Sequence, residues 1–173
     1  MNHIAILAER GIQDEEFIYP YYRLLEERYT VDVATLGGTN VTSKNGAIVK
    51  ATMAIETMDA DRYDCVLIPG GFESPSRLRT IPEVRRFVRK IHDQDKLVAA
   101  ICHGSWVCIS AGIVKGKKMT SYDLEIDLTN AGAIFVDAPV VVDGNLITAP
   151  HYRNNGDFMR EVVGWLNQRE MLK

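Results

Sequence analysis

Short apolar runs and segments of helical spacing alternate along this chain. Strands are predicted from continuous or alternating apolar runs at residues 3–8, 30–35, 65–68, 97–101 and 119–121. Amphipathic helices are predicted where apolar residues recur every three or four positions, at residues 15–27, 82–93, 105–111, 124–130 and 157–169. Strands separated by helices indicate an α/β fold with a mostly parallel sheet covered on both faces.

Turn residues add detail to this pattern. Asn45-Gly46 and Asp143-Gly144 each separate two extended pieces, which predicts two hairpins. Thr80 and Glu83 have the spacing of a capping box at the start of a helix. Pro20 predicts a kink or a late start in the first helix, because proline removes a backbone donor and crowds the preceding turn.

The stretch from Leu97 to Gly112 is central to the prediction of function. It reads LVAAICHGSWVCISAG and passes from an apolar strand through Cys102-His103-Gly104 into a helix that ends at Gly112. A thiol at a strand-to-helix turn lies at a helix N-terminus, where free N–H groups and the helix dipole favour an anion. Such surroundings lower the pKa of a cysteine, so we expect Cys102 to be a reactive nucleophile rather than a buried core residue.

Composition narrows the class of protein. The 173 residues suit one domain spanning 1–173, with 46% hydrophobic and 25% charged residues. A formal net charge of −3 gives no electrostatic reason to expect a nucleic-acid or membrane partner, and no apolar run approaches the roughly 20 residues of a membrane span. Three cysteines without CxxC spacing predict neither a disulfide framework nor a zinc site. We therefore expect a cytoplasmic protein that uses no metal and no cofactor.

Several motifs are recognisable in combination. In chain order they are Tyr19–Leu24 (YPYYRL), Leu67–Gly71 (LIPGG), Ala100–Gly104 (AICHG), Thr120–Tyr122 (TSY), Asn130–Gly132 (NAG) and Val140–Asn145 (VVVDGN). With these motifs the chain resembles the ThiJ/PfpI family of the class I glutamine amidotransferase-like superfamily, along nearly its whole length. The resemblance implies a flavodoxin-like three-layer sandwich with a mostly parallel central sheet, a cysteine on a nucleophile elbow, and a homo-oligomer. It also implies one of the activities described for the family: intracellular protease or amidase, glyoxalase or deglycase, or oxidative-stress protein.

The resemblance further implies acidic partners for the cysteine. The family glutamate comes from the loop after the first strand, and an alignment on Tyr19–Tyr21 without gaps puts Gln13 at its position. A glutamine amide donates a hydrogen bond to a thiolate, but it does not transfer a proton near neutral pH. We assign Glu15 and Glu16 to the first turn of the helix, where carboxylates favour the helix dipole. Ser76 occupies the position of a second acidic residue, which protease-like members take from a neighbouring subunit.

The expected site combines a nucleophile, a proton-transfer group and hydrogen-bond donors. Cys102 attacks, and His103 either assists proton transfer or makes a structural contact at the turn. Backbone N–H groups around Gly71 and His103 are candidates for an oxyanion hole, whereas the alternative is that Gly70 and Gly71 only permit the turn. The residues expected to bind the thiolate or the substrate are Gln13, Gly70, Gly71, Tyr122 and His151.

Other reactive or aromatic side chains receive structural assignments. Cys65 lies inside an apolar strand and is expected in the core. Cys108 follows Cys102 by six residues, about 240° around a helix, and is expected to point away from it. Tyr19, Tyr21 and Tyr22 are expected to contribute to the core and to a subunit interface.

Two classes of function remain open at this stage. The first is a cysteine-dependent hydrolase or lyase of the ThiJ/PfpI type that acts on a small carbonyl or amide substrate, or on a peptide. The second is a redox-responsive stress protein or chaperone without turnover, which senses oxidants through Cys102. A glutaminase-like subunit is a third possibility, but the sequence contains no evident Cys-His-Glu set with the required spacing.

Overall fold

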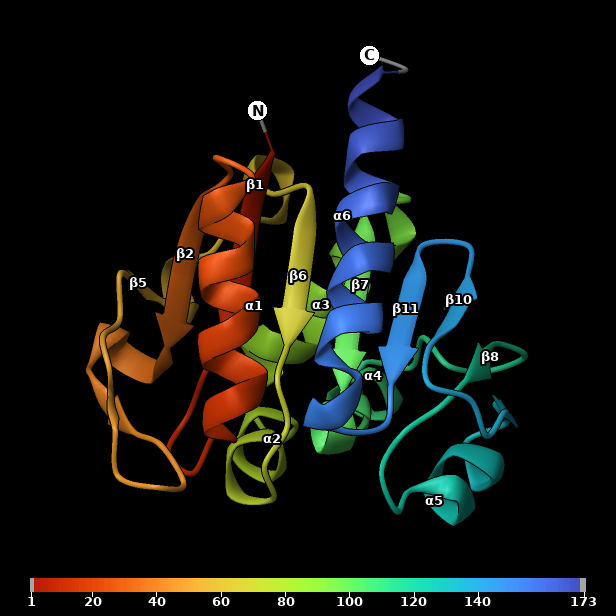
Figure 1. Ribbon diagram of the computed structural model, residues 1–173. Helices are drawn as coiled ribbons and strands as arrows, with labels where there is room; N and C mark the ends of the chain where they lie inside the picture. Colours follow the sequence, from red (N-terminus) through yellow and green to blue (C-terminus); the bar gives the residue numbers. More distant parts are fainter. Residues whose placement is uncertain (1, 172–173) are drawn as a thin grey trace.

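A seven-stranded sheet forms the centre of the molecule, with the strands in the order β10-β11-β7-β6-β1-β2-β5 (Figure 1). The computed structural model describes residues 2–171. The strands of this sheet are β1 (His3–Leu7), β2 (Thr30–Thr35), β5 (Met53–Ala54), β6 (Cys65–Ile68), β7 (Leu97–Ile101), β10 (Val141–Asp143) and β11 (Leu146–Ala149). All neighbouring pairs are parallel except β10 and β11, which form the antiparallel hairpin predicted around Asp143-Gly144.

Helices cover both faces of the sheet. In Figure 1, α1 (Asp14–Glu26) and α6 (Asn155–Met171) lie in front of it, and α3 (Pro82–Asp93) and α4 (Ser105–Ser110) lie behind. The front core contains Leu24 of α1 and Phe158 of α6, while Phe87 and Val107 belong to the rear core. The fold is therefore the predicted flavodoxin-like three-layer sandwich, and the central strands are apolar throughout because both faces are buried.

Smaller elements decorate the sandwich. They are α2 (Glu73–Leu78), α5 (Glu125–Asn130), the hairpin of β3 (Val41–Thr42) with β4 (Ile48–Val49), and the parallel pair of β8 (Lys118–Met119) with β9 (Ile134–Phe135). The β3–β4 hairpin turns at the predicted Asn45-Gly46 position, and Gly46 has a φ of 95°. Met53 follows the hairpin and begins β5, which extends the main sheet beside β2.

Two local predictions about helices fail. Pro20 neither kinks α1 into two segments nor delays its start, since the helix runs continuously from Asp14 to Glu26 and buries Pro20 on its inner face. The predicted capping box is absent, because Ile81 is the N-cap residue of α3 and its side chain makes no cap hydrogen bond. The Thr80 hydroxyl donates to the carbonyl oxygen of Arg77 instead. Pro82 begins the helix, where its missing N–H costs nothing.

The arrangement of the sheet brings the functional segments to one edge. The arrowheads of β2, β6, β7 and β11 all point to this edge in Figure 1, and ligands bind beyond the carboxyl ends of strands in open parallel sheets. The loops that follow β1, β6 and β7 meet there. Within residues 2–171, no helix has the length and apolar character needed to cross a membrane.

Candidate active site

Cys102 is held in a strained turn between β7 and α4. Its backbone has a φ of 59°, in the left-handed region that costs a non-glycine residue about 1–3 kcal/mol. A single 3₁₀ turn, Cys102–Gly104, joins the strand to the helix. A Cβ on Gly104 would lie 2.2 Å from the carbonyl oxygen of Ile68, so the turn passes directly over the end of β6. The result is the predicted elbow, with the thiol projecting from the sheet edge.

The Pro69-Gly70-Gly71 turn packs tightly beside this elbow. A Cβ on Gly70 would lie 2.6 Å from the Cβ of Cys102, and one on Gly71 would lie 2.4 Å from the carbonyl oxygen of Gly11. Gly71 also has a φ of 86°. The backbone N–H groups of Gly71 and His103 lie near the Cys102 thiol and act to lower its pKa. The glycines therefore permit the turn and also allow backbone donors to reach the thiol.

Glu16, not Gln13, is the acidic partner of Cys102. The buried Glu16 carboxyl lies beside the Cys102 side chain: a Cβ on Gly70 would be 2.5 Å from Glu16 Oε2 and 2.6 Å from the Cβ of Cys102. Its Oε2 accepts the Gly70 N–H at 2.8 Å. Gln13 is engaged elsewhere, since its amide nitrogen donates to Glu15 and its amide oxygen accepts from Lys44 Nζ at 3.2 Å. The prediction that Gln13 holds the thiolate is wrong. Glu16 lies in the first turn of α1 as predicted, but its side chain is buried beside Cys102. The site has a titratable carboxyl after all.

The position of Glu16 follows from the period of α1. Glu16, Pro20 and Leu24 are buried and are separated by four residues each, so they form the inward stripe of the helix. The ungapped alignment on Tyr19–Tyr21 matches positions along the chain, whereas the burial of a side chain in α1 depends on its angle around the helix. The four-residue spacing was the signal in the sequence that identifies Glu16 as an inward-facing carboxyl.

Burial shifts the titration of both partners. Desolvation raises the pKa of Glu16 to about 7, although the Gly70 N–H and the nearby Cys102 thiol act to lower it. Desolvation, together with the negative charge of Glu16, raises the pKa of Cys102 to about 12, and the N–H groups of His103 and Gly71 oppose this rise. The depressed thiol pKa that we predicted is therefore absent while Glu16 is ionised. Protonation of Glu16 removes the repulsion between the two groups.

His103 lies next to the thiol. Its Nδ1 is 3.4 Å from the Cys102 sulfur, and burial lowers the pKa of the imidazole. A lowered pKa keeps the ring neutral near pH 7, in the state that accepts a proton. The ring is not paired with an acidic residue from the segment after the Pro69-Gly70-Gly71 turn. In that segment Glu73 instead accepts hydrogen bonds from Arg10 and Arg77.

Aromatic rings surround His103 on several sides. Phe72 and Trp106 lie 5.7 and 4.8 Å from its ring centroid, and Tyr122 lies 6.0 Å away. The ring of His151 is 5.3 Å from that of Tyr122. The structure thus brings the predicted residues Tyr122 and His151 to the same side of the site as His103. Phe72 and Trp106, which sequence reasoning did not select, complete this group.

The remaining cysteines lie in the core as predicted. Cys65 and Cys108 have no exposed surface, and burial raises the pKa of each thiol. Cys108 belongs to the rear core, whereas Cys102 packs with the front core. Residues 2–171 contain no group of three or more histidine, cysteine or acidic side chains arranged to hold a metal ion.

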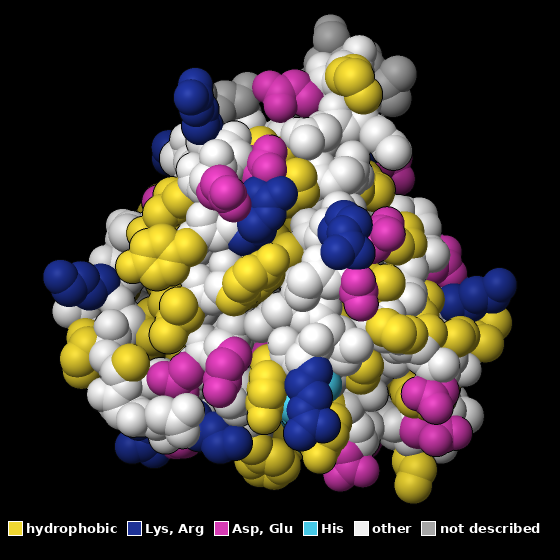
Figure 2. Space-filling view, in the orientation of Figure 1, with side chains coloured by type: hydrophobic (Ala, Val, Ile, Leu, Met, Phe, Trp, Pro, Cys, Tyr) yellow, Lys and Arg dark blue, Asp and Glu magenta, His cyan; other side chains and the backbone are white. Residues whose placement is uncertain are grey.

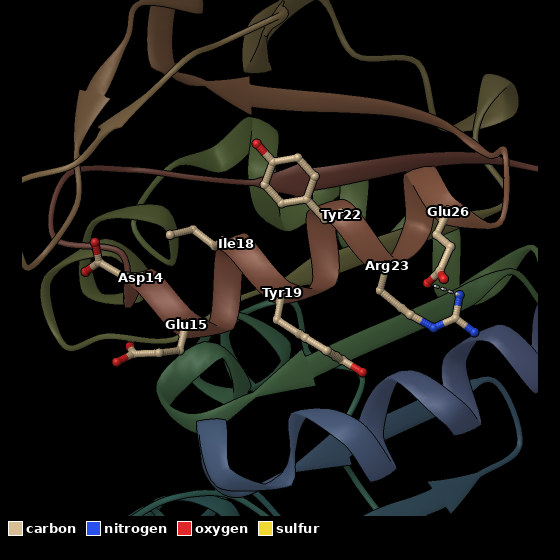
Figure 3. Close-up of a pocket in the computed structure, with 7 residues that line it drawn as sticks. All are labelled: Asp14, Glu15, Ile18, Tyr19, Tyr22, Arg23 and Glu26. Atoms are coloured by element: carbon tan, nitrogen blue, oxygen red, sulfur yellow. Dashed lines mark ion pairs between the residues drawn. The ribbon is translucent and has the colours of Figure 1, made fainter.

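A separate hollow lies on the outer surface of α1. It measures about 630 Å³ and is lined by Asp14, Glu15, Ile18, Tyr19, Tyr22, Arg23 and Glu26 (Figure 3). Tyr22 is 65% exposed and Tyr19 is 44% exposed, so these two tyrosines are not core residues of the single chain. Figure 2 shows hydrophobic side chains gathered over this helix. The hollow does not include Cys102 and is distinct from the candidate active site.

Comparison with known proteins places this geometry in context. A model of the DJ-1/PfpI family matches residues 2–164. The chain is 38% identical over 161 residues to "Deglycase PfpI" of Pyrococcus furiosus, covering 92% of this chain and 96% of that protein. It is 40% identical over 165 residues to YraA of Bacillus subtilis, described as a candidate cysteine protease, and the alignment covers 94% of this chain and 97% of that protein. A two-domain protein of Anabaena variabilis with DJ-1/ThiJ/PfpI-like and ferritin-like domains superposes with a TM-score of 0.94 at 34% identity, over 96% of this chain and 48% of that chain.

Proposed function

The chain belongs to the DJ-1/PfpI family, and we propose that it is a cysteine-dependent hydrolase that acts on a small carbonyl adduct or amide, of the deglycase type. The observation that supports this most directly is the buried Glu16 carboxyl beside Cys102 at the elbow. A carboxyl with a pKa of about 7 exchanges a proton near neutral pH, which a general acid–base catalyst requires. The names of the relatives agree with this class of reaction.

The proposed mechanism begins with a proton shared by two groups. When Glu16 carries the proton, Cys102 can be a thiolate that accepts hydrogen bonds from the carboxyl and from two backbone N–H groups. The sulfur attacks the carbonyl carbon of the substrate, an S–C bond forms, and the carbonyl π pair moves to oxygen. For an amide substrate, the oxyanion then reforms the carbonyl, the C–N bond breaks, and the leaving amine takes the proton from Glu16, which leaves a thioester on Cys102. His103, neutral and 3.4 Å from the sulfur, accepts a proton from the water that attacks the thioester carbon. The C–S bond breaks, the acid product leaves, and the proton on His103 returns to Glu16.

Turnover assays with matched cysteine variants test the proposal. The substrates are methylglyoxal, its adduct with an N-acetylated amino acid, and a chromogenic peptide. Cys102→Ala should lower kcat/KM at least about 10³-fold, the usual cost of removing a nucleophile. Cys108→Ala removes a thiol of the same size from the rear core and should retain most activity. Equal turnover by wild type and Cys102→Ala on every substrate would contradict the proposal.

A second candidate function is a redox-responsive protein, which the difference in exposure among the thiols favours. Cys102 is 8% exposed, whereas Cys65 and Cys108 have no exposed surface. Mild peroxide should therefore oxidise Cys102 selectively, and peptide mass spectrometry measures the sulfinic acid at each position. Selective oxidation without turnover on the three substrates would support this candidate over the hydrolase. Equal oxidation of all three cysteines would count against it.

The chain is also proposed to form a homo-oligomer through the outer surface of α1. This surface presents Ile18, Tyr19 and Tyr22, each at least 44% exposed. Glu15 lies in the first turn of α1, and Arg23 lies about two turns later along the helix (Figure 3). A second copy packed antiparallel about a two-fold axis near Tyr19 places each Glu15 opposite an Arg23, because both residues are four positions from Tyr19. Arg23 also forms ion pairs with Glu26 and Glu27 of its own helix, so the contact with Glu15 across the axis would add to an existing cluster of charges beside the apolar side chains.

A further inference from the structure

A second cavity adjoins the candidate active site on the side of the β3–β4 hairpin. It measures about 410 Å³ and is lined by Arg10, Gly11, Thr42, Ser43, Lys44, Phe72 and Glu73. We refer to it as the Lys44 cavity. Its lining comes from the loop after β1, from the hairpin, and from the start of α2.

The Lys44 cavity shares a wall with the catalytic groups. Phe72 lines it, and the ring of Phe72 packs edge-on against His103 at a centroid distance of 5.7 Å. Gly11 lines it as well, and the close approach between Gly11 and Gly71 joins the cavity to the Gly70-Gly71 turn that packs against Cys102. The positive charge of Lys44 also lowers the pKa of Glu16 and of His103, which agrees with its position beside them. A substrate bound at Cys102 can therefore extend into this cavity.

The charge of the cavity is positive although that of the whole chain is negative. Glu73 accepts hydrogen bonds from two guanidinium groups, Arg10 and Arg77, through the same oxygen, so these three groups together carry a net charge of +1. Within the described part of the chain, no carboxylate lies within ion-pair distance of Lys44. Its Nζ donates to the neutral amide oxygen of Gln13, which holds the exposed ammonium at the cavity. This contact gives Gln13 a positioning role in place of the predicted thiolate contact.

We propose that the Lys44 cavity binds a carboxylate group of the substrate whose carbonyl reacts at Cys102. The inference rests on the proposed function in that it takes Cys102 as the reacting group. Lys44 is the main binding residue, and Arg10 adds positive charge at the rim. The substrate class is thus a carbonyl or amide compound that carries a free carboxylate. Such a carboxylate comes either from a modified free amino acid or from the C-terminus of a modified peptide.

Alkylation of Cys102 by matched reagents measures this preference without requiring turnover. N-(iodoacetyl)glycine carries a carboxylate one residue beyond the reactive carbon, and N-(iodoacetyl)glycinamide carries a neutral amide at the same place. In each reaction the sulfur forms a bond to the methylene carbon and iodide leaves. The rate of Cys102 alkylation by the acid is divided by the rate with the amide. This ratio is then divided by the same ratio for the thiol of free glutathione, which corrects for the intrinsic reactivity of the two reagents and gives the preference for the acid. The iodoacetyl derivatives of triglycine and its amide test the peptide source.

Three proteins give the comparison. We expect wild type to prefer the acid, and Lys44→Met to lower the preference about fivefold, as expected for a partly exposed charge pair. Lys50→Met removes the same charge from the same hairpin, outside the Lys44 cavity, and should keep the wild-type preference. A larger preference with the glycine pair indicates a free amino acid, and a larger one with the triglycine pair indicates a peptide. An unchanged preference in Lys44→Met, or an equal loss in Lys50→Met, overturns the proposal.

A binding measurement separates this inference from the reactivity of the thiol. If Cys102 reacts slowly with every reagent, the proposed function fails, and the cavity is then tested by NMR titration of the Cys102→Ser protein. N-acetylglycine should bind at least about fivefold more tightly than N-acetylglycinamide, and Lys44→Met should abolish that difference. Equal affinities for the acid and the amide overturn the carboxylate site whatever the result of alkylation.

Discussion

The carboxyl of Glu16 and the side chain of Cys102 both lie against Gly70, and the negative charge of Glu16 raises the pKa of the Cys102 thiol. Gly70 packs against both side chains. Its N–H donates a hydrogen bond to the Glu16 carboxyl, and its lack of a side chain leaves room for Glu16 and Cys102. The reactivity of the thiol therefore depends on the protonation state of a residue 86 positions earlier in the chain.

Glu16→Gln should lower the pKa of Cys102. Above about pH 7 the wild-type carboxyl is ionised and its charge raises the pKa of the thiol, whereas an amide carries no charge. At pH 8 the variant should react with iodoacetamide about tenfold faster, which corresponds to one pKa unit. The rates should converge below pH 6, where wild-type Glu16 is also neutral. Turnover should fall about 10²-fold, because an amide transfers no proton.

Glu15→Gln is the matched control for this change. It removes a carboxylate from the adjacent, exposed position and should leave the pH profile of alkylation close to that of wild type. Identical pH profiles for wild type and Glu16→Gln would show that the charge of Glu16 does not act on the thiol.

The same carboxyl makes stability depend on pH. The pKa of Glu16 rises from 4.5 to about 7 on folding, so the folded state favours the protonated carboxyl. The associated stabilisation is fully present below pH 4.5 and is lost as the pH rises through 7. Between pH 4.5 and 8, wild type should lose about 3 kcal/mol of unfolding free energy relative to Glu16→Gln. Urea denaturation of both proteins at a series of pH values measures this difference, and parallel curves would exclude a raised pKa.

Local patterns in the sequence predict most of the architecture and the nucleophile. Continuous apolar runs identify β6 and β7, and the Cys102-His103-Gly104 turn identifies the elbow, because these features depend on neighbouring residues. The proton partner was misassigned to Gln13, which is the N-cap residue of α1 and lies three positions before the inward-facing Glu16. The angle around the helix, with Pro20 and Leu24 in line, selects Glu16.

The aromatic surroundings of the site were only partly predictable. Phe72, Trp106 and Tyr122 come from three segments, and each lies within about 6 Å of the His103 ring. Their proximity depends on how loops from separate strands meet at the sheet edge, which no local pattern contains. The same reason explains why Lys44, on a hairpin that precedes β6, was not associated with the site.

Gly70→Ala should damage both stability and activity. The added Cβ would lie 2.5 Å from Glu16 Oε2 and 2.6 Å from the Cβ of Cys102, so it displaces the catalytic pair. We expect a loss of about 2 kcal/mol or more in unfolding free energy, with turnover reduced at least about tenfold. Gly164→Ala is the control, because its Cβ meets no atom within 4 Å and α6 gains a better helix former. A fully active and stable Gly70→Ala protein would contradict the close packing.

Substitutions on the outer surface of α1 should dissociate the proposed homo-oligomer. Tyr22→Lys places a charge in the apolar part of that surface and should raise the dissociation constant at least about tenfold, measured by size-exclusion chromatography with light scattering. Ile126→Lys changes a side chain of similar exposure on α5, outside that surface, and should leave the assembly unchanged.

Charge reversal tests the antiparallel arrangement itself. Glu15→Arg alone sets two positive charges opposite each other at the two-fold interface and should weaken the assembly, as should Arg23→Glu. The double variant restores opposite charges across the interface, so it should recover most of the affinity. A parallel pairing brings each residue next to its own copy, and the double variant would then recover nothing. A wild-type protein that is monomeric at micromolar concentration would exclude both arrangements.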